Sequence, residues 1–223
     1  MSVKNAFTSL GIKSYLCGAM PQPQHIYPVF DQLLQRAHKE QLLQQRGITL
    51  WFTGLSGAGK TTIAQALEQA LYQNGIITQV LDGDNLRTGL NNNLGFTEAD
   101  RTENIRRVAE VAKLFTHCGI VVIACFISPT HAIRQQAKQI IGATDFKEIF
   151  IDAPLAICEE RDVKGLYKKA RAGLIKDFTG IDAIFEPPQH PDLTLDTTQF
   201  TITQNVTQAL QFLLPLIRIE TPS

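Results

Sequence analysis

The segment Gly54–Thr61 has the sequence Gly-Leu-Ser-Gly-Ala-Gly-Lys-Thr and fits every fixed position of the pattern G-x-x-x-x-G-K-[ST]. An apolar run at 48–53 precedes it, as expected of a buried strand, and a helical pattern at 60–74 follows it. A loop between a strand and a helix N-terminus brings several backbone N–H groups and the positive end of the helix to one point, which suits a phosphate. The alternative is a glycine-rich turn without a ligand, and the neighbours of the loop argue against it.

The motif gives its last two residues separate tasks. The Lys60 ammonium would reach the β- and γ-phosphates of a nucleoside triphosphate, and the Thr61 hydroxyl would ligate Mg²⁺. The predicted nucleotide-binding residues are Gly54, Leu55, Ser56, Gly57, Ala58, Gly59, Lys60, Thr61 and Thr62.

Strand and helix patterns alternate along the rest of the chain. Strands are expected at 48–53, 76–81, 120–126, 147–152 and 193–195, and helices at 60–74, 98–117, 130–141 and 203–214. This order predicts an α/β fold of the P-loop nucleoside triphosphate hydrolase type, with three layers, a mostly parallel sheet and helices on both faces. Ligands of such sheets bind outside the carboxyl ends of the strands.

The first 45 residues are expected to form a separate arm. Residues 1–28 carry three of the ten prolines and no clear pattern, whereas 31–45 shows a moderate helical stripe. We therefore predict an N-terminal arm with a helix at 1–45 and a P-loop domain at 46–218.

Composition excludes several classes of partner. Lysine plus arginine equals aspartate plus glutamate at 21 each, so no global field draws the chain to nucleic acid or to an anionic membrane. No apolar run is long enough to span a membrane, and the start lacks a signal-peptide pattern. The four cysteines form no C-x-x-C pair. We expect a cytoplasmic protein with reduced thiols.

Three polar residues follow the ends of expected strands. Asp82 and Asp84 flank a glycine and are expected to ligate Mg²⁺ through water or to accept a proton from a substrate hydroxyl; the alternative is an ordinary Asp-Gly turn. Ser128 follows the third apolar strand and either contacts substrate or caps the next helix.

Basic residues gather near the expected long helix. Arg101 and Asn104 lie three apart on one helical face, where they could fork onto an anionic substrate group. Arg106 and Arg107 are more often part of a solvated face, with partners such as Glu103.

The segment 164–173 has the composition of a basic lid. Four basic residues lie among glycines, and a hinged basic flap would bring positive charge to a transferring phosphoryl group; an exposed basic helix is the simpler alternative. Phe96 and Phe178 stand in glycine-containing loops, either as core residues or as platforms for a planar base, where stacking contributes about 1–3 kcal/mol.

Taken together, these segments resemble the adenylyl-sulfate kinase family over about residues 46–215. The phosphate loop is shared with many kinases, whereas the other blocks in this order are specific to the family. The matching segments are 54–61, 81–87, 94–101 with 103–107, 126–129, 164–173 and 178–182.

The resemblance implies a reaction. ATP would donate its γ-phosphoryl group to the 3′-hydroxyl of adenylyl sulfate, giving ADP and 3′-phosphoadenylyl sulfate in sulfate assimilation. It also implies Mg²⁺ bound with ATP, a homodimer, and a possible functional link to ATP sulfurylase.

The resemblance also implies roles for individual residues. Lys60, Asp84 and Ser128 would be catalytic, with Asp84 orienting or deprotonating the 3′-hydroxyl. Thr61 and Asp82 would hold the metal, and Arg171 would close over ATP. The implied substrate-binding residues are Asp84, Arg87, Phe96, Arg101, Asn104, Ile127, Ser128, Lys164, Lys168 and Phe178.

The role of Ser128 stays open. The family labels this position a phosphoserine intermediate, which would make the chain a phosphoprotein. In-line transfer, however, needs positioning and charge more than a covalent carrier, and no sequence neighbour would activate its hydroxyl.

Two other functions compete with this interpretation. Another small-molecule P-loop kinase, of the gluconate or nucleoside monophosphate type, shares the loop and the lid. A non-catalytic nucleotide-binding protein would retain the loop alone, and the features that fit it are the unusual pair Thr130-His131 after Ser128-Pro129 and the N-terminal residues 1–28, which match no family pattern.

Overall fold

The computed structural model describes residues 25–219 and divides the chain into two compact units, 1–33 and 34–223. In the first unit, the described residues contain one turn of 3-10 helix, η1 (Phe30–Gln32). The expected irregular segment at 1–28 lies mostly outside the described residues. The division of the chain at 45/46 stays a prediction.

The helix expected at 31–45 is shorter than predicted and belongs to the second unit. Helix α1 spans Arg36–Leu43 and ends where Gln44 adopts a left-handed conformation, with φ of 54°. The next residue, Gln45, is fully buried, and its side-chain amide donates to the carbonyl oxygens of Ile77 and Gly119. Helix α1 therefore ends just before the residue whose side chain bonds to the segments that precede β2 and β3.

Five parallel strands form the sheet, in the order β2-β3-β1-β4-β5. Strand β1 (Ile48–Thr53) lies at the centre, between β3 (Val121–Cys125) and β4 (Phe146–Asp152). The outer strands are β2 (Thr78–Asp82) and β5 (Leu193–Asp196). All five predicted strands are confirmed, with limits that differ by one or two residues.

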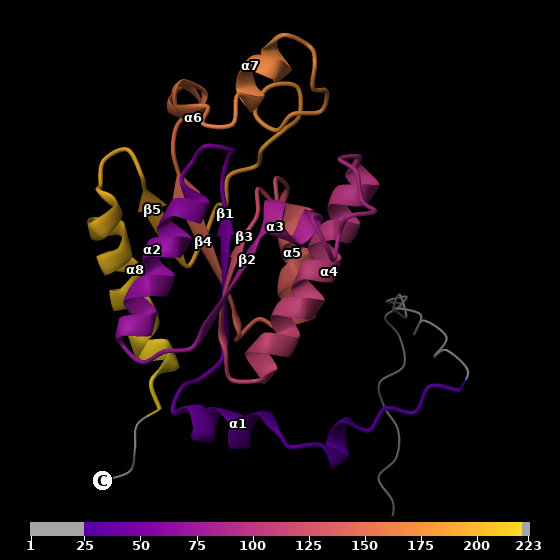
Figure 1. The fold of residues 1–223 in the computed structure, drawn as a ribbon, viewed down its shortest axis with the longest axis vertical. Helices are drawn as coiled ribbons and strands as arrows, with labels where there is room; N and C mark the ends of the chain where they lie inside the picture. The colour runs from indigo at the N-terminus through magenta and orange to yellow at the C-terminus, as the bar shows by residue number, and fades with distance from the viewer. Residues whose placement is uncertain (1–24, 220–223) are drawn as a thin grey trace, which may run out of the picture. The chain divides into compact units, whose positions relative to one another are not determined.

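Helices cover both faces of this sheet, as predicted (Figure 1). Helices α2 (Lys60–Gln73) and α8 (Ile202–Ile217) contact each other on one face, and α4 (Glu98–His117) contacts α5 (His131–Ile141) on the other. The three-layer fold follows from strands that are apolar on both sides, because both faces must be shielded from water.

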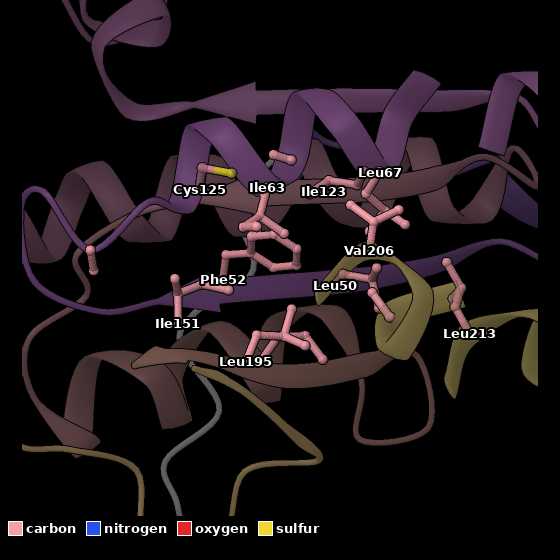
Figure 2. Close-up of a cluster of buried hydrophobic side chains, with 14 of the residues drawn as sticks. Leu50, Phe52, Ile63, Leu67, Ile123, Cys125, Ile151, Leu195, Val206 and Leu213 are labelled. Atoms are coloured by element: carbon pink, nitrogen blue, oxygen red, sulfur yellow. The ribbon is translucent and has the colours of Figure 1, made fainter. Parts of the chain in front are cut away.

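Two apolar cores result, one on each face, because successive side chains of a strand point in opposite directions. Leu50 and Phe52 of β1 pack into the core under α2 and α8, whereas Trp51 packs into the core under α4 and α5. Figure 2 shows the first core, where Phe52 lies beside Ile63 of α2. Burying a side chain of this size stabilises the fold by about 1.5–3 kcal/mol.

The starts of the long helices agree with the sequence. The Thr97 hydroxyl accepts from the backbone N–H of Asp100 and caps α4, and Thr130 caps α5 in the same way. Helix α8 runs longer than the expected 203–214, because Thr201 and Gln204 form a capping box at its start.

Two short helices were not expected from the sequence, α3 (Gly83–Arg87) and α6 (Leu155–Arg161), whereas a third, α7 (Leu166–Arg171), lies in the segment for which a basic helix was the alternative to a lid. The Asp82 carboxylate caps α3 by accepting from the backbone N–H groups of Asp84 and Asn85. Helix α7 lies within the predicted basic lid (Figure 1). No helix among residues 25–219 has the length and apolar character that crossing a lipid bilayer requires.

Candidate active site

The carboxyl ends of the strands carry the candidate site residues. The loop Gly54–Thr61 leaves β1 and enters α2, as predicted. Gly54 has φ of 148°, and a Cβ there would lie 2.4 Å from the carbonyl oxygen of Ile151 on β4. Only glycine lets the loop pass this close to the neighbouring strand.

The Lys60 side chain folds back over the loop. Its ammonium donates to the carbonyl oxygens of Gly54 at 2.9 Å and Leu55 at 2.8 Å. Burial, with a smaller contribution from the nearby charge of Lys164, lowers the pKa of Lys60 from 10.5 to about 8. The buried ammonium of Lys60 therefore lacks a full negative counter-charge until an anion binds.

Two oxygens beside the loop suit a magnesium ion. The Thr61 hydroxyl donates to Oδ2 of Asp82 across 2.9 Å, which places one hydroxyl and one carboxylate next to each other. Mg²⁺ is commonly held by one or two protein oxygens together with substrate phosphates and water, and this donor set fits that pattern. Within the part of the chain that the structure describes, no group of three or more His, Cys, Asp and Glu side chains could hold a metal alone.

Asp84 faces the basic lid. It stands on α3, and its carboxylate forms an ion pair with the ammonium of Lys164, just before α7. Both side chains are exposed, so solvent and substrate can reach the pair. The structure thus brings together two predicted site residues from distant parts of the sequence.

Arg87 and Phe96 form a second contact. The Arg87 guanidinium carbon lies 4.3 Å from the centre of the Phe96 ring, and its Nη1 donates to the carbonyl oxygens of Leu94 and Gly95. The Phe96 residue is 64% exposed, so an arginine on the ring leaves much of its surface accessible. This arrangement suits a platform for a planar group.

Arg101 links two loops. Its side chain donates to the carbonyl oxygens of Phe96 and Asp177 and to the hydroxyl of Thr179. These contacts tie the start of α4 to the loops that carry Phe96 and Phe178. The expected salt bridges of Arg106 and Arg107 to Glu103 are present, and they lower the pKa of Glu103 to about 2.

Asn104 and Phe178 are both buried in this structure. Asn104 is 5% exposed and accepts from the side-chain amide of Asn91 at 3.0 Å. Phe178 is 9% exposed and packs edge-on against Tyr167 of α7, with ring centres 5.0 Å apart. Their predicted contacts with a substrate stay predictions.

Ser128 is buried at the end of β3, with φ of 38°, which is unusual for a residue with a side chain. Its hydroxyl accepts from the indole N–H of Trp51 at 3.1 Å and contacts the hydroxyl of Thr53, which also donates to the carbonyl oxygen of Ile127. Among residues 25–219, no general base contacts the hydroxyl. The geometry suits a residue that shapes the 127–128 backbone.

A buried ion pair supports Ser128 and was missed from the sequence. Arg134 is 2% exposed; it donates to Glu148 at 2.6 Å and to the carbonyl oxygen of Ser128 at 3.0 Å. Arg134 therefore stabilises the fold from the inside and is not exposed for contact with a substrate. Its position on the expected helix at 130–141 was the only available signal, because Glu148 lies on a different strand.

The two other predicted binding residues of the lid, Lys168 and Arg171, are exposed. Lys168 projects from α7, and Arg171 forms an ion pair with Glu159 of α6 at 2.7 Å. The Tyr167 hydroxyl donates to the carbonyl oxygen of Ser56, which anchors the lid to the phosphate loop. Thr62, in the first turn of α2, is exposed.

A hollow of about 470 Å³ opens beside the phosphate loop. Leu55 of the loop, Leu155 of α6 and residues 180–185 line it. The lining residues 180–185 follow Phe178 in the chain, and none of the predicted substrate-binding residues lines the hollow.

Sequence reasoning also missed two residues that contact the phosphate loop. Arg161 ends α6 and donates to the carbonyl oxygen of Gly57, and Thr197 follows β5 and donates to that of Ala58. The signal for Thr197 was available, because it follows a strand end as Asp82 and Ser128 do.

Comparisons with known proteins point in one direction. The sequence profile described as adenylylsulphate kinase matches residues 46–196. A protein of Bacteroides fragilis named adenylyl-sulfate kinase is 58% identical over 198 residues, which cover 89% of this chain and 98% of that protein. A protein of the same name from Clostridium acetobutylicum is 53% identical over 180 residues, covering 81% and 90%.

Solved structures agree with the sequence relatives. The Mycobacterium tuberculosis APS kinase CysC, in complex with AMPPNP and APS, is 48% identical with a TM-score of 0.73, over 76% of this chain and 98% of that one. A hexameric APS kinase from Thiobacillus denitrificans is 32% identical with a TM-score of 0.58, over 77% of this chain and 29% of that one. A sugar kinase of Janibacter, 19% identical with a TM-score of 0.53, shares the fold.

Proposed function

The chain belongs to the adenylylsulphate kinase family, and from this premise we propose that it transfers the γ-phosphoryl group of ATP to the 3′-hydroxyl of adenylyl sulfate. The products are ADP and 3′-phosphoadenylyl sulfate. The observation that carries the proposal is the ion pair of Asp84 with Lys164, because it joins a carboxylate to the basic lid two residues after Asp82, which contacts Thr61 of the phosphate loop.

The phosphate loop holds the donor. Backbone N–H groups of Gly54–Thr61 and the N-terminus of α2 face the phosphates, and Lys60 exchanges its contacts with Gly54 and Leu55 for phosphate oxygens. Arg171 leaves Glu159 to contact ATP when the lid closes. Thr62 lies within the first turn of α2 and contributes its backbone.

Thr61 and Asp82 hold Mg²⁺ together with the phosphates. When bound, the ion withdraws charge from the phosphate oxygens and aligns the triphosphate. The hydrogen bond that joins the two side chains keeps both oxygens in place.

The acceptor lies on the other side of the loop. Phe96 supports its adenine, with Arg87 behind the ring, and Arg101 fixes the loop that carries Phe96. The backbone at Ile127 and Ser128 contacts the ribose-phosphate portion. Phe178, Asn104 and Lys168 complete the acceptor site from the lid side and from α4.

Asp84 acts on the reacting hydroxyl. Its carboxylate is exposed and leaves Lys164 to orient the 3′-hydroxyl and accept its proton as the oxygen attacks phosphorus. Lys60 and Lys164 then stabilise the negative charge of the transferring group. Positioning and charge of this kind account for most catalysis of phosphoryl transfer.

A coupled ADP-release assay tests the proposal. We expect ADP release with Mg-ATP and adenylyl sulfate, and no comparable release with AMP, gluconate or shikimate as acceptor. Equal or faster release with gluconate would assign the chain to another class of P-loop kinase. ATP binding without turnover of any acceptor would favour a non-catalytic protein.

The setting of the reaction is part of the proposal. We place the enzyme in the cytoplasm as a homodimer, with ATP sulfurylase as the source of adenylyl sulfate. The family resemblance, the balanced charge and the pattern of cysteines support this setting. Light scattering of the purified protein tests the dimer, and a monomer at all concentrations would refute it.

A further inference from the structure

Thr197, the first residue after β5, contacts the phosphate loop directly. Its hydroxyl lies 2.8 Å from the carbonyl oxygen of Ala58, and its backbone N–H donates to the carbonyl oxygen of Asp152 at 3.0 Å. A Cβ added to Gly59 would lie 3.4 Å from the Thr197 methyl group. The end of β5 therefore packs against the last part of the loop.

Arg161 completes this contact from α6. Its Nη1 donates to the Thr197 hydroxyl at 3.0 Å and to the carbonyl oxygen of Gly57 at 3.3 Å, and its Nη2 donates to the carbonyl oxygen of Thr197 at 2.8 Å. Because the hydroxyl accepts from Arg161, its single hydrogen is left to donate, and of the two carbonyl oxygens within reach that of Ala58, at 2.8 Å, is nearer than that of Asp152, at 3.3 Å. The three groups form a directed chain of hydrogen bonds that ends on the loop.

The peptide bond explains what this chain of bonds achieves. A trans peptide is planar, and its carbonyl oxygen and N–H point in opposite directions. Holding the Ala58 carbonyl toward Thr197 therefore turns the N–H of Gly59 away from Thr197, toward the inside of the loop. Gly59 has φ of 104°, a conformation that glycine adopts readily and that other residues rarely adopt.

We propose that Thr197 and Arg161 are positioning residues, which hold Gly57–Gly59 in the anion-binding conformation before ATP arrives. The inference rests on the proposed function only for the identity of the acceptor. Preorganised N–H groups bind an anion without spending free energy on ordering the loop. Removing this support should lower the affinity for ATP. The affinity for adenylyl sulfate should not change, because the proposed acceptor site is formed by other residues.

The test uses the full chain and four substitutions, three at Thr197 and Thr198 and one at Arg161. Thr197→Val keeps the shape of the side chain and removes the hydroxyl, and Thr197→Ser restores the hydroxyl. Thr198→Val is the matched control, because Thr198 is exposed and its hydroxyl bonds to Asp196 instead of the loop. Calorimetry gives the Kd of ATP with no acceptor present, and steady-state kinetics give both KM values.

We expect Thr197→Val to raise the Kd of ATP about tenfold, as for the loss of one hydrogen bond. Thr197→Ser should return the Kd to within about twofold of the wild type, and the KM of adenylyl sulfate should stay constant in all variants. Arg161→Lys should raise the Kd of ATP at least as much as Thr197→Val does, because a lysine ammonium cannot reach all three acceptors of Arg161 at once.

The proposal is overturned by an unchanged Kd of ATP in Thr197→Val, by the same loss in Thr198→Val, or by no recovery in Thr197→Ser. An equal rise in both KM values would also overturn it, because that indicates general loosening of the fold. Since ATP binding is measured without acceptor, a failure to phosphorylate adenylyl sulfate would refute the proposed function and leave this result standing.

Discussion

Lys164 of the lid and Asp84 of α3 form an ion pair, although 80 positions separate them in the sequence. Their side chains are 59% and 70% exposed, so the pair contributes about 0–1 kcal/mol. Because the contact is weak, the negative charge of bound nucleotides can draw Lys164 away and free the carboxylate for the acceptor hydroxyl. The ion pair keeps the lid close to α3, and little free energy is needed to break it.

Replacing the Asp84 carboxylate tests this role. We expect Asp84→Asn to lower kcat by about 10²–10⁴-fold, the usual contribution of a general base, while the Kd of ATP stays within about twofold. Asp31→Asn, an exposed aspartate in the first unit, serves as the control. Full turnover in Asp84→Asn would remove the carboxylate from the mechanism.

Removing the Ser128 hydroxyl separates a positioning role from a covalent one. We expect Ser128→Ala to keep at least about a tenth of the wild-type kcat, because no base contacts the hydroxyl. The free energy of unfolding should fall by about 1–3 kcal/mol, since the Trp51 indole N–H loses its acceptor.

Intact-mass spectrometry provides the decisive measurement for Ser128. Wild-type protein incubated with Mg-ATP alone should gain no phosphoryl group. A stoichiometric gain that disappears in Ser128→Ala, together with complete loss of turnover, would establish the phosphoserine intermediate instead.

Phe96 and Phe178 should respond differently to truncation. Phe96 is 64% exposed, so Phe96→Ala should raise the KM of adenylyl sulfate at least about fivefold, as for the loss of a stacked base, with little change in stability. Phe178 is 9% exposed, so Phe178→Ala should lower the free energy of unfolding by about 3–5 kcal/mol. Chemical denaturation of both variants checks the contrast, and an equal loss of stability would contradict it.

ATP binding should take up a proton at alkaline pH. Burial lowers the pKa of Lys60 from 10.5 to about 8 in the nucleotide-free protein, and bound phosphates should raise it again. Above about pH 8 the free protein therefore loses a proton that the complex retains, and ATP affinity should fall with rising pH. Calorimetry at pH 9 in two buffers of different ionisation enthalpy measures the uptake.

Lys60→Arg is the matched control for this proton uptake, because its guanidinium stays charged at pH 9 and should show none. Lys60 also affects stability in the same window. The unfolded chain binds more protons than the folded one between about pH 8 and 10.5, so this group's contribution to the free energy of unfolding rises with pH there. Uptake that persists in Lys60→Arg would point to another group.

Local patterns in the sequence were sufficient for most of the fold. The limits of α4 follow from the Thr97 cap and an apolar face, and the five strands follow from short apolar runs. The helices α3 and α6 were missed because they are shorter than two full repeats of helical periodicity. Helix α3 depends on the Asp82 side chain, which the sequence suggested as a metal ligand, as a proton acceptor or as part of an Asp-Gly turn, but not as a helix cap.

The candidate site was less accessible to sequence reasoning, because its contacts join distant segments. Spacing along α4 placed Arg101 and Asn104 on one face, yet Arg101 bonds to Asp177 and Thr179. The glycines beside Phe178 gave no indication that Tyr167 packs against its ring. Such contacts depend on the tertiary structure and produce no periodic pattern in the sequence.

The attachment of α1 has a practical consequence for recombinant work. Arg36 forms an ion pair with Asp145 before β4, and the buried Gln45 side chain bonds to Ile77 and Gly119. A truncated clone limited to the profile match at 46–196 would lose both anchors and also α8, which would expose the part of one sheet face that α8 covers beside α2. Such a fragment should aggregate on expression, whereas a clone that starts at residue 34 and retains the C-terminal helix preserves every one of these supports.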